Sequence, residues 1–276
     1  MTTRITSRPT AAVALALPAD ASAVSLASRR VLATAAFLLM AVATVLAQGG
    51  SAFYLGAHAG ANGSQFRFTE DLSELYQTSD RIAGVNVGLD AGVQVGHWTF
   101  GTGLGYVQRG GQYETGTFTE EDGRTGYFSA RERLHFINVP VTLGYSGRLA
   151  NKIGYTVAAG PSFNFGLTGR INETTEYFEE EFPVTQNHKV AFGSGVNDDY
   201  RGTQVDFRLQ PGVYFDVNRH SRITLNAVFD YGTKDAFNPR YRQANAFFSD
   251  YRGTLTGRMR AVTLGYQYRI PVADRY

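Results

Sequence analysis

The segment from Tyr155 to Gly166 alternates between apolar and small polar residues with a period of two. This period predicts a β-strand, because successive side chains of a strand point to opposite faces of the sheet. The apolar face would meet another sheet in a soluble sandwich, or lipid in a membrane barrel. Its members are Tyr155, Val157, Phe163 and Phe165, and those of the polar face are Gly160, Ser162 and Asn164.

The same alternation recurs at least eight times after Gln48. The candidate strands are 53–61, 82–95, 98–110, 134–146, 153–167, 204–217, 223–232 and 261–270. Short joins at 96–97, 147–152 and 218–221 alternate with long polar joins. This sorting predicts an all-β fold, an eight-stranded antiparallel up-and-down transmembrane β-barrel with short periplasmic turns and long extracellular loops. The apolar faces then meet lipid, and the polar faces fill the interior.

Three prolines interrupt these candidate strands. Pro140, Pro161 and Pro211 each lack the backbone donor that a sheet ladder uses. Sheets normally confine proline to edges or bulges. If the join at 147–152 closes a simple hairpin, Pro140 and Pro161 lie at similar heights on neighbouring strands, so we expect a local bulge or bend there.

The first 47 residues have a different pattern. Arg29 and Arg30 precede an uncharged apolar run that ends in Val45-Leu46-Ala47, the layout of a secretory signal peptide. A transmembrane anchor is the alternative, although it needs about 20 apolar residues. We therefore predict a leader at 1–47 and an outer-membrane β-barrel domain at 48–276.

Composition and charge narrow the classes of function. The chain has no cysteine, which excludes disulfides, thiol nucleophiles and thiolate metal sites. The leader holds four arginines and one aspartate, so the formal charge of +2 becomes about −1 without it. Nothing in this balance indicates a nucleic-acid partner.

Several motifs resemble those of the PorT-like outer-membrane β-barrel family. They are LGYVQRGG at 104–111, LHFINVPVTLGYSG at 134–147, AAGPSFNFGL at 158–167, VDFRLQPGVYFDV at 205–217 and LGYQYRI at 264–270. The resemblance implies an eight-stranded barrel in the outer membrane of Gram-negative bacteria, with one branch serving protein secretion. One departure is the tail PVADRY, because such barrels usually end on a strand-closing aromatic residue. The assembly signal is then Tyr276, or else Tyr266 and Tyr268.

Charged residues of the polar face predict an ion pair in the interior. If the join at 218–221 is a tight hairpin, Arg208 faces Asp230 on the neighbouring strand. The pair serves as part of a structural plug or as part of a gated ion path. Further polar residues expected in the interior are His58, Asp90, Asp206, Asp216 and Arg269.

The long loops at 170–200 and 233–256 combine charge with aromatic side chains. Such side chains supply buried area in protein interfaces at low entropic cost. Loops are also commonly polar without any binding role. Our candidates for contact with a protein partner are Tyr177, Phe178, Phe182, Tyr241, Phe247 and Phe248.

Candidate catalytic chemistry is sparse. The five histidines are scattered, and His135, expected on the lipid-side face, has no serine beside it on that face. The glycines of GTGLG at 101–105 lie on a strand with no helix after them, unlike a nucleotide-binding loop. The calcium candidates, TEEDG at 119–123 and NDD at 197–199, lack a full ligand set. We predict no catalytic, metal or cofactor site.

The sequence therefore predicts a non-enzymatic outer-membrane protein with a structural or protein-interaction role, an accessory to protein secretion being one form of it. A narrow porin and a lipid-modifying enzyme using His135 are the alternatives. Expected partners are the lipid of the outer membrane, a protein bound through the extracellular loops, and the barrel assembly machinery during insertion.

Overall fold

The structure is a computed structural model that describes residues 51–69, 76–119, 123–180, 182–240 and 253–271. These residues belong to one compact unit, 46–276. The predicted leader at 1–47 and the tail after residue 271 lie outside the described residues, so neither prediction is tested.

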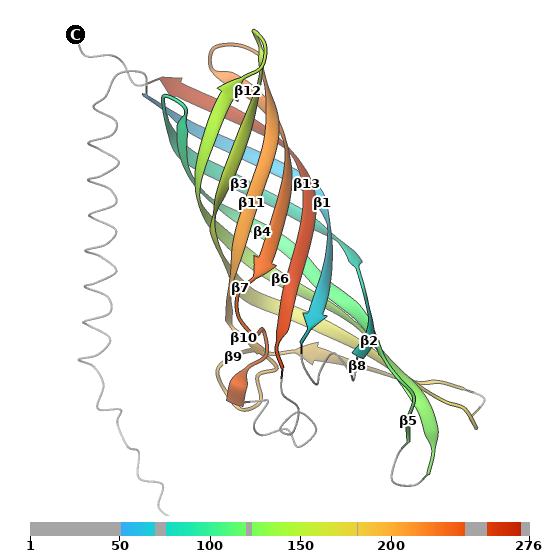
Figure 1. The fold of residues 1–276 in the computed structure, drawn as a ribbon. Helices are drawn as coiled ribbons and strands as arrows, with labels where there is room; N and C mark the ends of the chain where they lie inside the picture. The colour runs from blue at the N-terminus through green and yellow to red at the C-terminus, as the bar shows by residue number, and fades with distance from the viewer. Residues whose placement is uncertain (1–50, 70–75, 120–122, 181, 241–252, 272–276) are drawn as a thin grey trace, which may run out of the picture. The chain divides into compact units, whose positions relative to one another are not determined.

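Eight long strands form a closed antiparallel ring (Figure 1). They are β1 (Ser51–Phe68), β3 (Ile82–Val95), β4 (Trp98–Thr115), β6 (Thr125–Arg148), β7 (Ile153–Tyr177), β11 (Thr203–Asp216), β12 (Ser221–Gly232) and β13 (Leu255–Pro271). Each strand pairs with the next in this order, and β13 closes the ring on β1. The predicted eight-stranded up-and-down barrel is confirmed, and closure satisfies the backbone of both edges of every long strand.

The two faces of the strands differ as the alternation requires. On β7, Ser162 and Asn164 are fully buried, whereas Val157 and Phe165 are more than 40% exposed on the outside. The same outward apolar band runs around the ring and includes Leu89, Leu104, Leu143, Phe207, Leu225 and Leu264. The predicted assignment of the two faces is confirmed on these strands.

The short joins all lie at one end of the barrel. Residues 96–97 connect β3 to β4, 149–152 connect β6 to β7, and 217–220 connect β11 to β12. These positions match the predicted short turns. The opposite end is therefore the extracellular one.

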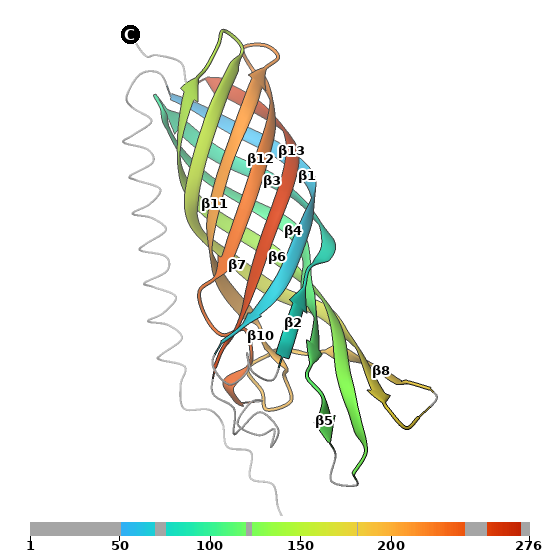
Figure 2. The ribbon, with the colours of Figure 1, turned by 45° about the vertical axis from the view of Figure 1, so that its right-hand side comes forward.

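At the extracellular end, part of the sheet continues well past the barrel (Figures 1 and 2). β6 and β7 have 24 and 25 residues, against 12 in β12, a difference of about 40 Å of strand. We call this projecting part the extension. The shorter strands β2 (Tyr76–Asp80), β5 (Phe118–Thr119) and β8 (Val184–Val190) pair with β4, β6 and β7, and β9 (Phe192–Gly193) and β10 (Tyr200–Arg201) form a separate parallel pair.

The prediction that 170–200 is one long loop is therefore wrong in its first part. β7 continues to Tyr177, and β8 returns along it from Val184. Both edges of β7 are paired beyond the bilayer, by β6 on one side and β8 on the other. A strand paired on both edges remains a strand whether its faces meet lipid or water.

Of the local bulge or bend predicted beside Pro140 and Pro161, the bulge is wrong, and the bend stays a prediction. The register between β6 and β7 runs without a shift from Phe136 opposite Gly166 to Arg148 opposite Gly154. A proline removes one ladder donor but adds no residue, and a register shift needs an extra residue. The shift occurs nearer the extracellular end, where His135 faces Thr168 and Leu167 is the extra residue.

Candidate functional site

The interior of the barrel contains a buried ion pair between adjacent strands. Arg208 of β11 lies opposite Asp230 of β12 in the register, and both residues point inward. The Nε of Arg208 donates to Oδ1 of Asp230 at 2.8 Å, and Nη2 donates to Oδ2 at 2.8 Å. This two-bonded arrangement is the strongest form of the Arg–carboxylate contact. The structure thus places the two sequence-predicted residues in direct contact.

Arg109 of β4 joins this pair from across the barrel. Its guanidinium group donates to Oδ2 of Asp230 at 2.5 Å and also to a carboxylate oxygen of Asp206. Asp206 accepts a further bond from the side-chain amide of Asn164 at 2.9 Å. Two guanidinium and two carboxylate groups balance in formal charge, and all four are at most 7% exposed. We call this set of four the central network.

A cluster of apolar side chains fills the interior on the extracellular side of the central network. Phe136, Val107 and Met259 have no more than 1% of their surface exposed, and they belong to one hydrophobic cluster. Tyr200 of β10 packs among them, and its ring centre lies 5.6 Å from that of Phe237. Charged and apolar side chains together thus fill this part of the interior, as an eight-stranded barrel allows.

The periplasmic half of the interior retains a small cavity of about 90 Å³ with a largely polar lining. His58 of β1 contacts Asp90 of β3 through Nδ1 at 2.8 Å and Asn86 through Nε2 at 3.3 Å. Arg269 of β13 also lines this cavity. The structure therefore brings His58 and Asp90 together, and it places Arg269 in the same cavity.

Asp216 lies apart from the central network, at the periplasmic end of β11. It accepts a bond from Nε of Arg222 at 2.8 Å, and the Arg222 guanidinium lies 3.5 Å from the ring centre of Tyr214. Asp216 thus makes its ion pair within the hairpin of β11 and β12, whereas Asp206 belongs to the central network.

A buried carboxylate, Glu132, lies inside the extension. On β6 the outward apolar band ends at Ile137, and Arg131 and Arg133 point outward on either side of Glu132, so this height lies outside the hydrocarbon. The hydroxyl groups of Tyr113 and Tyr200 both donate to the carboxylate, the first at 2.6 Å. Burial raises the pKa of Glu132 to about 7, although the two hydroxyl donors favour its charged form.

The aromatic residues predicted to contact a partner divide into two groups. Phe178 and Phe182 are 63% and 75% exposed at the outer end of the extension. Tyr177 ends β7, with the Arg124 guanidinium 4.4 Å from its ring centre. The other three candidates lie outside the described residues, namely Tyr241, Phe247 and Phe248.

The described residues bring together few of the side-chain groups that catalysis requires. His135 is on the outer face, and its Nδ1 lies 2.5 Å from the hydroxyl of Tyr106. Across the described part of the chain, no histidine ring nitrogen contacts a serine or threonine hydroxyl group. Among the described residues, no three His, Asp or Glu side chains gather to hold a metal ion. Asp198 and Asp199 instead accept bonds from the backbone amides of Gly195 and Ala191.

Sequence reasoning missed Arg109 and Glu132. Arg109 shares the inward parity of the glycines at 101, 103 and 105, so alternation along β4 already contained the signal. Glu132 has the inward parity of Asn138, but it precedes the predicted start of its strand at residue 134. A buried charge beyond the expected strand end has no counterpart in the apolar pattern.

A ring of eight antiparallel strands with an apolar outer band and a filled interior defines a closed outer-membrane β-barrel. The chain belongs to the outer membrane protein beta-barrel domain family, whose model matches residues 46–238. It is a protein of the outer membrane. Within the described residues, no helix has the length and apolar character that crossing a membrane requires.

Solved structures with a similar arrangement include the following three proteins. Neisserial surface protein A is 11% identical, with 80% of this chain and 99% of that chain covered and a TM-score of 0.39. Ail, the attachment invasion locus protein of Yersinia pestis, is 14% identical, with coverages of 81% and 100% and a TM-score of 0.29. The outer membrane protease OmpT of Escherichia coli is 9% identical, with coverages of 81% and 98% and a TM-score of 0.31. None of the curated proteins matches the sequence.

Proposed function

We propose that this chain is a non-enzymatic, non-conducting outer-membrane barrel that presents its extension to a protein partner outside the cell. The observation that carries the proposal is the position of β8. This strand pairs with β7 on one edge, and among the described strands no partner covers its other edge. Six of its seven residues are exposed.

The partner that this arrangement fits is an extended polypeptide segment that adds to the free edge of β8. A strand edge offers a row of backbone donors and acceptors, and strand addition is a common mode of peptide recognition. The exposed rings of Phe178 and Phe182 lie in the turn that leads into β8, and Val184 begins the strand with 42% of its surface exposed. These apolar side chains would contribute buried area beside the backbone hydrogen bonds.

The experiment that tests this proposal is site-specific photo-crosslinking in intact cells. A photoreactive residue at Gln186 on β8 should capture a protein whose crosslinked peptide comes from an extended segment. The double variant Phe178→Ser, Phe182→Ser should weaken this capture at least fivefold. The matched control is Leu149→Ser, because Leu149 is 65% exposed in a turn at the opposite end of the barrel. Equal capture by the double variant and the control would refute the proposal.

The finer form of this proposal is an accessory role in protein secretion, which the PorT-like motifs support. Its test compares the secreted proteins of a deletion strain with those of its parent by mass spectrometry. Loss of large cargo proteins from the medium, with their accumulation inside the cell, is the expected result. Matching profiles would remove the secretion role and leave the partner-binding role to the crosslinking experiment.

A narrow channel is the second candidate function. The observation in its favour is the polar cavity in the periplasmic half of the interior, lined by His58, Asp90 and Arg269. Conductance in planar bilayers distinguishes the two, because a barrel closed by the central network should be silent. Steady single-channel currents from the wild-type protein would favour the channel.

The third function considered, a lipid-modifying enzyme using His135, has less support. The hydrogen-bond partner of the His135 imidazole is the phenol of Tyr106, and among the described residues no serine or threonine hydroxyl group and no carboxylate contacts this histidine. We expect the lipid A of a deletion strain to be unchanged, which mass spectrometry of extracted lipid would check.

A further inference from the structure

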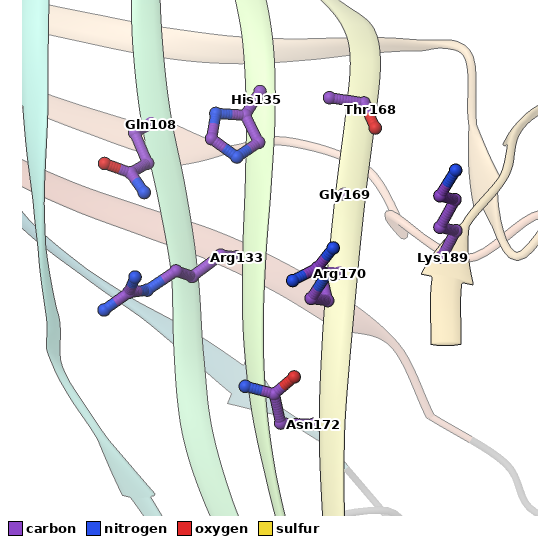
Figure 3. A pocket seen from close by; sticks show the side chains of 8 residues that line it. All are labelled: Gln108, Arg133, His135, Thr168, Gly169, Arg170, Asn172 and Lys189. Atoms are coloured by element: carbon purple, nitrogen blue, oxygen red, sulfur yellow. The ribbon is translucent and has the colours of Figure 1, made fainter. Parts of the chain in front are cut away.

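Three cationic side chains lie directly opposite one another on three adjacent strands of the extension. Arg133 of β6 faces Arg170 of β7, and Arg170 faces Lys189 of β8. Neighbouring strands are about 4.8 Å apart, so the three residues form one short row across the sheet. Figure 3 shows the three side chains at about the same level. We call this set the cationic row.

The cationic row lies on the outer face of the sheet, just above the apolar band. Arg133 has the same outward parity as Ile137 and is four residues nearer the extracellular end. Four residues correspond to about 13 Å along the strand. On β7 the extra residue Leu167 changes the parity, so that Arg170 points outward beyond the bulge. All three cationic side chains are exposed.

Like charges directly opposite each other destabilise a sheet, so the row needs a compensating anion. In the described part of the chain, none of the three cations makes an ion pair with an aspartate or glutamate. Long cationic side chains are common at a membrane border because they reach the water. That preference explains a cation near the border but not three in direct opposition.

The row lines an open pocket of about 380 Å³ that contains no carboxylate. The remaining lining residues are Gln108, His135, Thr168, Gly169 and Asn172. Most of these side chains offer a hydrogen-bond donor, and Figure 3 shows them on the strands around the row. Three cations with polar donors beside them make a site that suits phosphate oxygens.

We infer that the cationic row binds the phosphate groups of a phosphorylated glycolipid in the outer leaflet of the membrane. The lipid chains would lie against the outward apolar band below, beside Phe165 and Leu167, and the phosphates would lie between Arg133, Arg170 and Lys189. A lipid held in this way neutralises the row and braces β8 against β7. This inference concerns a lipid site on the outer face and is independent of the partner proposed for the edge of β8.

The test compares the full-length wild type with the triple variant Arg133→Gln, Arg170→Gln, Lys189→Gln. Both are reconstituted in phosphatidylcholine nanodiscs that contain lipid A with its two phosphates or the dephosphorylated lipid. The readouts are the lipid A retained after extraction, measured by native mass spectrometry, and the unfolding temperature. Each cation near an anionic surface strengthens the attraction by roughly fivefold, so the triple variant should retain phosphorylated lipid A roughly 100-fold more weakly.

The matched control removes three other outward cations at the same border, in the variant Arg67→Gln, Arg258→Gln, Arg260→Gln. These residues lie on β1 and β13, and none of them is directly opposite another in the register. The control measures the general attraction between a cationic border and an anionic lipid. We expect the fold-decrease in retention of phosphorylated lipid A to be at least ten times larger in the triple variant of the cationic row than in the control variant.

Three outcomes would overturn the inference. One is equal retention of phosphorylated and dephosphorylated lipid A by the wild type, and another is equal loss in the two triple variants. The third is a wild-type unfolding temperature raised as much by inorganic pyrophosphate in phosphatidylcholine nanodiscs as by lipid A, which would assign the row to a soluble anion. If the triple variant does not fold, the single variant Arg170→Gln should retain phosphorylated lipid A about fivefold more weakly than the wild type. The variant Arg170→Lys should keep most of the wild-type retention.

Discussion

The buried carboxylate of Glu132 should make the stability of the extension depend on pH, in the direction opposite to that of most carboxylates. Its side chain is 2% exposed, and the hydroxyl groups of Tyr113 and Tyr200 are its hydrogen-bond donors. Burial raises the pKa from an ordinary value of 4.5 to about 7. The folded protein therefore binds a proton more tightly than the unfolded chain does.

The sign and size of the effect follow from this difference in proton affinity. A group with a raised pKa contributes its full stability below the pKa of the unfolded chain and loses it as pH rises through the folded pKa. The window is therefore about pH 4.5 to 7. At about 1.4 kcal/mol for each power of ten in proton affinity, the wild type should lose about 3 kcal/mol across the window.

The substitution Glu132→Gln should remove this dependence. Glutamine is a neutral analogue of the protonated acid, because its carbonyl oxygen can accept a hydrogen bond from one tyrosine hydroxyl and its NH2 group can donate to the other. We expect the variant to match the wild type at pH 4.5 and to exceed it by about 3 kcal/mol at pH 8.5.

Urea unfolding in detergent micelles, followed by circular dichroism at several pH values, measures the free energy of unfolding. The control is Glu179→Gln, which changes the same charge at an exposed position near the end of β7. An unchanged pH dependence in Glu132→Gln, or a variant less stable than the wild type at pH 8.5, would refute the reasoning.

Three further predictions concern the barrel itself. Asp230→Ala leaves Arg109 and Arg208 without their shared carboxylate, so the free energy of unfolding should fall by about 3–5 kcal/mol, measured by urea unfolding. The combined variant Arg208→Met, Asp230→Leu should lower the free energy of unfolding less than Asp230→Ala does. A larger decrease would contradict the role assigned to the unpaired charges. The substitution Gly60→Ala should destabilise by about 1–3 kcal/mol, because a methyl group there would lie 2.0 Å from the carbonyl oxygen of Val262, whereas Ala59→Gly on the outer face should cost less.

The fold was predictable because one physical rule governs most of the chain. Inside the bilayer, a closed ring of strands must alternate between lipid and a filled interior, so parity alone assigns the two faces. The opposition of Arg208 and Asp230 followed from the same parity and one tight turn. Both depend on local spacing, which the sequence contains directly.

The features that the sequence did not predict depend on contacts across the barrel or on a change in which alternate residues of a strand face inward. Arg109 reaches two aspartates on strands that are not its neighbours, and no spacing along the chain encodes that distance. The outer part of β7 was predicted to be a loop. Its faces meet water and the internal core of the extension instead of lipid, and the apolar pattern is therefore weaker there. The extra residue Leu167 then moves Arg170 to the outer face, where simple alternation would have placed it inside.

That extra residue also determines where such a barrel can change during evolution. Deleting Leu167 would remove the bulge and restore simple alternation along β7, with Arg170 still facing outward and Ile171 still facing the apolar core of the extension. Deleting one residue elsewhere in the strand would turn part of it inside out unless the bulge absorbed the change. The junction between the transmembrane part of β7 and the extension is therefore the place where this strand tolerates the loss of one codon.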